Sequence, residues 1–142
     1  MTRPTDFKQL SDLDATLADR SALTLGLDNL LGRWVNTNGE TRGVAEFTIE
    51  HDGPRFTVRA RGVGDGDAVH WPETEAVALA NVGEEGGQRT IILVATFAFG
   101  FMRTETQIRV NKGVLVLVFF NTFLDGSGRS DYVTREFFYR PG

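Results

Sequence analysis

The chain has 142 residues, carries a formal net charge of −4 and contains no cysteine. Hydrophobic residues make up 41% of it and charged residues 24%, a composition typical of a single globular domain. The missing cysteines exclude disulfides, thiolate metal ligands and a cysteine nucleophile. The negative charge argues against nucleic acid and an anionic membrane as partners, because both are bound through clustered positive charge.

The first 31 residues have a helical hydrophobic pattern. The apolar side chains that fall on one helix face are Phe7, Leu10, Leu13 and Leu17. Asp28 can cap one further helical turn, which Gly32 ends. We expect residues 1–31 to be an amphipathic segment that either closes the open end of the domain formed by residues 32–142 or braces its outer wall. The N-terminal sequence lacks the apolar stretch of a secretory signal, which predicts a cytoplasmic protein.

From Arg33 onward the hydrophobic period changes to two, and turn residues recur about every ten positions. Short turns between consecutive strands predict an all-β, eight-stranded antiparallel up-and-down barrel, since closure removes exposed strand edges. A two-sheet sandwich needs a long crossover, and only residues 63–75 could form one. The predicted strands are residues 33–38, 42–51, 54–62, 75–81, 89–99, 102–110, 114–124 and 131–140.

Most of these strands alternate between apolar and polar residues, which gives each one buried face. The side chains expected on those buried faces include Ala45, Phe47, Ile49, Phe56, Val58, Ala60, Met102, Ile108 and Val110. Two other strands, with the sequences ILVATFAF and VLVLVFFNTF, are apolar on both faces. The pattern leaves open which of their faces is internal. The other face needs a cover, either the N-terminal segment or a second subunit in a homodimer.

The start of the first predicted strand resembles a known family. A short helical turn, Asp28 to Leu31, runs into Gly32-Arg33-Trp34. This arrangement is similar to the Gly-x-Trp motif of the lipocalins and the wider calycin superfamily. The resemblance implies an eight-stranded barrel whose base is closed by Trp34, with Arg140 or Arg135 from the last strand packed over the indole. A guanidinium suits that place because the face of an indole ring attracts a cation.

The sequence disfavours several more specific ligands for such a barrel. Gly32, Trp34 and Asn36 also match the Gly-x-Trp-x-Asn pattern of avidin-type biotin binders. However, Glu40 stands where those proteins carry a small hydroxyl residue, and only one further tryptophan, Trp71, is present. The two histidines are expected beside a turn and in a loop, where neither suits a haem ligand. Two histidines without cysteine also disfavour a transition-metal site. No nucleophile elbow or dinucleotide fingerprint is present, and we expect neither a metal nor a cofactor.

Several polar residues lie on otherwise apolar strand faces. A buried polar group without a partner costs about 1–3 kcal/mol, so each must pair across strands, for instance Glu136 with an arginine, or contact a ligand. An eight-stranded barrel has room for side chains or for one small ligand. We therefore expect Glu136, Asn121 and Tyr132 to be catalytic groups. The expected ligand-binding residues are Trp34, Asn36, Phe47, Trp71, Phe97, Phe99, Met102, Phe119, Phe123 and Phe138, with Phe137 and Tyr139 also in the wall.

Two functional hypotheses follow for a hydrophobic small molecule as the partner. Barrels of this size and expected location resemble small cyclases of polyketide biosynthesis, including Diels–Alderases. That resemblance implies cofactor-free cyclisation or isomerisation, which needs positioning and a hydrogen bond to a carbonyl rather than a nucleophile or metal. The alternative is a non-catalytic, lipocalin-like carrier or sensor of a hydrophobic small molecule. A structural role, with the doubly apolar strands as an interface, is the third possibility.

Overall fold

The computed structural model describes residues 29–53, 55–64, 68–81 and 90–141. These residues form nine strands: β1 (Gly32–Asn36), β2 (Val44–Asp52), β3 (Arg55–Val63), β4 (Ala68–His70), β5 (Thr74–Asn81), β6 (Thr90–Ala98), β7 (Met102–Asn111), β8 (Val114–Phe123) and β9 (Tyr132–Tyr139). Within the described part of the chain, no helix has the length and apolar character needed to cross a membrane. Residues 1–28 of the predicted N-terminal amphipathic segment, residues 1–31, lie outside the described residues.

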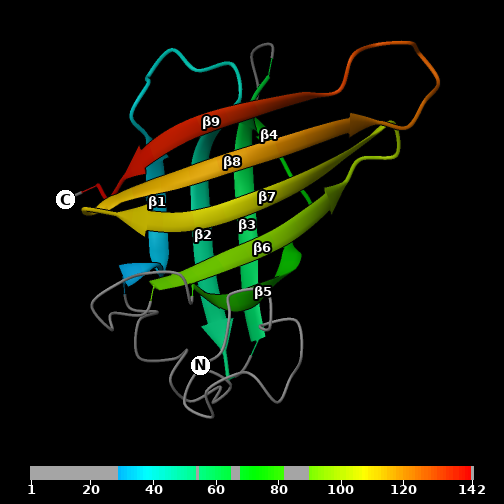
Figure 1. The fold of residues 1–142 in the computed structure, drawn as a ribbon. Coiled ribbons are helices and arrows are strands. Elements are labelled where there is room, and N and C mark those ends of the chain that lie inside the picture. The colour runs from blue at the N-terminus through cyan, green and yellow to red at the C-terminus, as the bar shows by residue number, and fades with distance from the viewer. Residues whose placement is uncertain (1–28, 54, 65–67, 82–89, 142) are drawn as a thin grey trace, which may run out of the picture.

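Eight of the strands close into an antiparallel barrel. Consecutive strands pair around the ring from β1 to β9, and pairing of β9 with β1 and of β2 with β3 completes the circle. In Figure 1, β1, β2 and β3 form the far side and β6 to β9 cross in front of them. This confirms the predicted eight-stranded barrel over the two-sheet sandwich, and it is the architecture that the calycin resemblance implies.

The ninth strand, β4, was not predicted, and it places His70 in a strand instead of a loop. β4 and β5 are two pieces of one barrel strand, because both pair with β3. Continuing the β4 register would put Glu73 opposite Val58, but Thr74 stands there, so the strand bulges by one residue. Pro72 lies in the bulge, where its missing N–H breaks the hydrogen-bond ladder. The sequence from 63 to 75 is therefore an interrupted strand, and the interruption carries Trp71.

The period-two pattern predicted most of the buried faces correctly. Phe47, Ile49 and Val58 are fully buried, and Phe56 and Ala60 nearly so. One prediction on β2 was wrong: Val44 is buried at 1% exposure and Ala45 is only half-buried. A β-bulge between Val44 and Glu46 shifts the alternation by one residue at the start of β2.

The base of the barrel is closed by Trp34, as the resemblance implies. The indole is 1% exposed, and its nitrogen donates a hydrogen bond to the carbonyl of Leu30 at 2.9 Å. Of the two candidate arginines, Arg140 takes the place over the ring, with its guanidinium carbon 4.7 Å from the ring centroid. Arg140 also donates to the carbonyl of Leu31 at 2.8 Å. The contacts of Arg140 join the end of β9 to the turn before β1, so they hold the first and last segments of the barrel domain together at the base.

The doubly apolar strands β6 and β8 turn one face inward and one outward. Their buried side chains are Ile91, Leu93, Ala95, Phe97, Leu115, Leu117 and Phe119. The outer wall exposes apolar groups next to β8, among them Phe120 (41%) and Val133 (58%), which pair across β8 and β9. Phe137 and Tyr139 are also on the outer wall, at 45% and 47% exposure, so their expected place in the inner wall was wrong. A homodimer through this wall stays a prediction.

Replacing Arg140 with Met should lower the free energy of unfolding by about 1–2 kcal/mol, because the cation–π contact and a charged hydrogen bond are both lost. Urea unfolding followed by tryptophan fluorescence measures this. Arg109→Met, on the exposed outer face of β7, is the matched control and should change stability by less than about 0.5 kcal/mol. Equal effects of the two substitutions would show that Arg140 does not secure the base.

Candidate functional site

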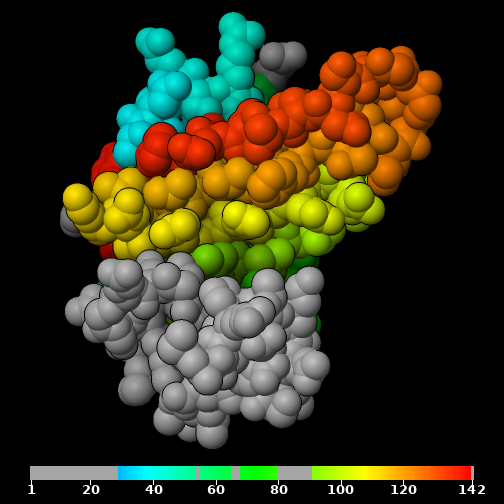
Figure 2. All heavy atoms as spheres, in the orientation of Figure 1, coloured from blue at the N-terminus to red at the C-terminus, as the bar shows by residue number. Residues whose placement is uncertain are grey.

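A pocket of about 410 Å³ opens at the end of the barrel opposite Trp34. The loop of residues 37–43, between β1 and β2, rises above β9 at this end, in cyan above red in Figure 2. We call this pocket the mouth pocket. Its lining residues are Asn38, Gly43, Val44, Trp71, Met102, Phe119, Asn121, Tyr132, Thr134, Arg135 and Glu136. They come from the interrupted strand, from β2 and its preceding loop, and from β7, β8 and β9.

Trp71 spans the barrel interior and forms the apolar part of the pocket. Its ring makes edge-on contacts with Phe97, Phe99 and Phe119, at centroid distances of 5.0, 4.9 and 5.8 Å. On the opposite side its indole nitrogen lies 3.1 Å from the place where a Cβ on Gly62 would be. The indole therefore reaches from β3 to β6 and β8. A side chain at position 62 would press against the indole, so Gly62 gives it room.

Glu136 supplies a carboxylate that is held by one oxygen. Oε1 accepts hydrogen bonds from the Asn36 amide at 3.0 Å and from the Thr41 hydroxyl at 2.8 Å. Oε2 accepts none from the residues that the structure describes, and Glu136 lines the mouth pocket. A Cβ on Gly43 would lie 3.0 Å from both oxygens, so the glycine makes room for the carboxylate. The partners of Glu136 within the described ranges are thus an amide and a hydroxyl, not the arginine considered from the sequence.

Asn36 and Thr41 are themselves fixed by the backbone. Asn36 also donates to the carbonyl of Val44 at 2.8 Å and accepts from the Asn38 N–H at 2.8 Å. The Thr41 hydroxyl accepts from the Gly43 N–H at 3.1 Å. Each polar atom of the Asn36 amide therefore has a partner. The side chain connects β1, the 37–43 loop and β9, and it holds the Glu136 carboxylate at the pocket wall.

Asn121 presents a hydrogen-bond donor on the β8 side of the pocket. Its carbonyl oxygen accepts from the Thr104 hydroxyl at 2.7 Å, and the residue is 6% exposed. Its amide nitrogen donates to none of the described residues. Thr106, one inward position along β7, is fully buried and its hydroxyl has no partner among the described residues. The polar groups of β7 and β8 therefore continue from the pocket into the barrel.

The expected site residues divide between the two ends of the barrel. All three expected catalytic residues, Glu136, Asn121 and Tyr132, line the mouth pocket together with Trp71, Met102 and Phe119. Phe97 and Phe99 contact Trp71, and Asn36 holds Glu136. Phe123 contacts Tyr132 at a centroid distance of 6.0 Å. Trp34, Phe47 and Phe138 are fully buried at the base and do not line this pocket.

Part of the pocket wall was not expected from the sequence. The lining residues not foreseen are Asn38, Gly43, Val44, Thr134 and Arg135. Asn38 and Gly43 belong to the loop after β1, and the sequence of that loop carries no period that would aim them at a site. Thr134 shares the alternation of Tyr132 and Glu136 along β9, so the period of two was the signal that pointed to it.

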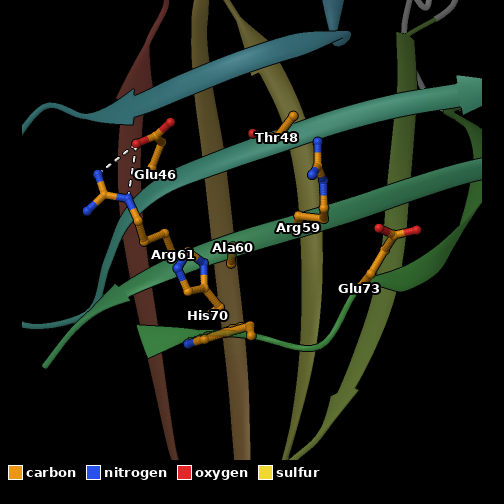
Figure 3. A pocket seen from close by; sticks show the side chains of 8 residues that line it. Glu46, Thr48, Arg59, Ala60, Arg61, His70 and Glu73 are labelled. Atoms are coloured by element: carbon orange, nitrogen blue, oxygen red, sulfur yellow. Dashed lines mark hydrogen bonds and ion pairs between the residues drawn. The ribbon is translucent and has the colours of Figure 1, made fainter. Parts of the chain in front are cut away.

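A second pocket, of about 370 Å³, lies at the interrupted strand and is lined mainly by charged residues (Figure 3). Glu46 accepts hydrogen bonds from Arg61 at 2.6 and 3.1 Å and forms an ion pair with Arg33. The hydrogen bond from Arg33 lowers the pKa of Glu46 below its ordinary value of 4.5, and Arg61 adds to this effect. His70 lies beside Arg61, its partner across β3 and β4, and Glu73 also lines this pocket. Its cations and carboxylates neutralise one another and select no ligand class.

The described residues contain no group of three or more His, Asp or Glu side chains that could hold a metal ion. Comparison with protein-family models, with curated proteins and with solved structures gives no match. The function proposed below therefore rests on the geometry of the mouth pocket.

Glu46→Gln should lower the melting temperature at pH 7 by about 2 °C, because a three-residue ion-pair network on the outer wall is lost. The folded-state pKa of Glu46 is lowered, so its contribution to stability is complete above pH 4.5 and disappears as the pH falls through the folded pKa. The difference between the two proteins should therefore shrink below pH 4.5 in thermal melts. Glu105→Gln, whose nearest arginine nitrogen is 3.7 Å away, is the matched control and should lower the melting temperature at pH 7 by less than Glu46→Gln does. A difference in melting temperature between the wild type and Glu46→Gln that stays constant down to pH 2 contradicts a lowered pKa of Glu46.

Proposed function

We propose that this protein binds a small, mainly apolar molecule in the mouth pocket and catalyses its cyclisation or isomerisation without a cofactor. The observation that carries the proposal is the Glu136 carboxylate, anchored through one oxygen with the other unpartnered at a pocket wall. A volume of about 410 Å³ is within the usual range for small-molecule sites. The aromatic side of the pocket suits an apolar ligand, and the polar side orients its oxygen atoms.

The chemistry assigned to Glu136 is proton transfer. Its free oxygen takes a proton from a hydroxyl or from a carbon next to a ligand carbonyl. The Asn121 amide donates a hydrogen bond to the oxygen on which negative charge develops. Returning the proton to another carbon gives an isomer. Attack of the new nucleophilic carbon on a carbonyl or conjugated alkene of the same molecule breaks that π bond and forms a ring, and Glu136 then returns the proton to the anion that results. Both outcomes conserve the atoms and electrons of the substrate.

The calycin-like barrel adds support of a more general kind. The resemblance stated from the Gly32-Arg33-Trp34 motif implies a barrel of the kind used by cyclases and Diels–Alderases of polyketide biosynthesis. In such enzymes the main contribution is to hold the two ends of one molecule in a reactive arrangement. A pocket bounded by the rigid Trp71 ring cluster suits that task. Fold likeness alone does not fix function, so the assignment depends on the groups in the pocket.

The binding part of the proposal is tested with N-phenyl-1-naphthylamine, a dye whose fluorescence rises in apolar surroundings. Thr134→Trp fills the pocket from its exposed rim and should weaken dye binding about tenfold. Thr96→Trp places the same side chain on the outer face of β6 and is the control. Equal dye affinities of the two variants would exclude the mouth pocket as the binding site.

The catalytic part is tested with 5-nitrobenzisoxazole, a flat apolar molecule that loses one carbon-bound proton to a base and opens to a coloured phenolate. Glu136→Gln should reduce the rate about tenfold or more with little change in melting temperature, since glutamine keeps an acceptor for Asn36 and Thr41 but is no base. Glu105→Gln, on the outer face of β7, should keep the wild-type rate. If the wild-type protein reacts no faster than buffer alone, catalysis is contradicted and only the carrier function remains.

A further inference from the structure

The mouth pocket contains two recesses that exist because glycines stand on neighbouring segments. Gly43 leaves room for the carboxylate of Glu136, and Gly62 leaves room for the indole nitrogen of Trp71. The two glycines are neighbours in the wall: the Gly43 carbonyl accepts from the Val63 N–H at 3.0 Å, and it lies 3.5 Å from the Cβ position of Gly62. Two polar groups from distant parts of the chain are thus directed at adjoining points of one wall.

The two groups have complementary, unused hydrogen-bonding capacity. The Trp71 indole N–H donates to no described residue, although most of its ring is enclosed by aromatic contacts. Glu136 Oε2 accepts from none. A tryptophan N–H that leaves water normally finds an acceptor, and a carboxylate oxygen normally finds a donor. Both atoms remain accessible to water, so a ligand group that displaces this water best replaces its hydrogen bonds by accepting one from the indole and donating one to the carboxylate.

We propose that Trp71 and Glu136 form a hydroxyl-recognition subsite, so that the ligand of the mouth pocket is an apolar alcohol, phenol or enol. A hydroxyl oxygen accepts from the indole N–H while its proton is donated to the carboxylate. An ether or ketone can use only the indole, and it leaves the carboxylate without a donor. The inference rests on the proposed function and narrows its substrate class.

The recognition assigns separate tasks to the polar groups of the pocket. Trp71 and Glu136 hold the hydroxyl, and Asn121 on the β8 side remains for a second oxygen of the ligand. For an enol or phenol, the proton that Glu136 takes is the hydroxyl proton, and the electron pair stays on the ligand oxygen beside the Trp71 N–H. Where that oxygen is conjugated with a second one, negative charge also develops on the second oxygen, to which Asn121 donates. Trp71 is then a specificity-determining residue for the same reaction.

The test compares 2-naphthol with 2-methoxynaphthalene, which have the same ring system but differ in the hydroxyl proton. Titrations are followed by ¹H–¹⁵N NMR of the folded, full-length chain, in which two tryptophans give two indole N–H signals. The Trp34 signal is an internal reference because that N–H is buried and donates to Leu30. We expect 2-naphthol to bind about tenfold more tightly than the ether and to move the Trp71 signal downfield.

Variants separate the two halves of the subsite. Trp71→Phe keeps an aromatic ring and removes the N–H, and Gly43→Ala adds a Cβ 3.0 Å from both Glu136 oxygens, which obliges the carboxylate to shift. Each should reduce the preference for 2-naphthol to about threefold or less. Gly39→Ala, in the same loop with nothing within 4 Å of the added Cβ, should keep the full preference. Melting curves check that each variant is folded, and Trp71→Phe decides the outcome where Gly43→Ala is not.

The possible results distinguish this inference from the proposed function. Equal affinity for both compounds, with chemical-shift changes at the mouth but none at the Trp71 N–H, overturns the hydroxyl subsite and leaves the small-molecule pocket intact. No change at any mouth residue with either compound contradicts the subsite and the proposed function together. A preference that survives in Trp71→Phe also overturns the assignment of the donor to Trp71.

Discussion

The interior of an eight-stranded barrel is so narrow that one large side chain can close it, and this constraint determines where the molecule is solid and where it is open. At the base, Trp34 takes that role, with Phe47 and Phe138 packed nearby at a centroid distance of 6.5 Å from each other. Toward the mouth the inward positions of β3 are small, Ala60 and Gly62. The space that they leave is taken by Trp71, and what remains beyond it is the pocket.

The candidate site lies where backbone pairing between the first and last strands stops. β1 pairs with β9 only through Val35 and Asn36, after which the chain enters the 37–43 loop. Beyond that point the side chains of Asn36 and Thr41 replace the ladder by binding Glu136. A carboxylate that accepts two hydrogen bonds can stabilise the loop and still have a free oxygen for a ligand. The structural and chemical roles of Glu136 therefore use different atoms.

The sequence predicted the barrel because period-two alternation and short turns are local properties of each strand. Glu136 and Asn121 were expected in the site because each is a polar residue on an otherwise apolar face, and the inward place of Trp34 was implied by the family resemblance. On the doubly apolar β8 the alternation left the inner face open. The sequence did not predict the bulge at Trp71-Pro72-Glu73 or the one at the start of β2, because a bulge depends on the register of a partner strand. The sequence also placed Trp34, Phe47 and Phe138 in one site with Trp71, although they lie at opposite ends of the barrel. Alternation gives the face of a residue but not its height along the barrel axis.

The position of Trp71 also sets the depth of the pocket. The described contacts of its side chain are ring contacts with Phe97, Phe99 and Phe119. Its backbone is anchored by the N–H that donates to the Ala60 carbonyl at 2.9 Å. Beneath the indole lies the hydroxyl of Thr106, opposite Phe119 in the β7–β8 register and without a partner among the described residues. Trp71 forms the apolar floor of the pocket and also carries the donor of the proposed hydroxyl subsite, so pocket depth and polar recognition depend on the same side chain.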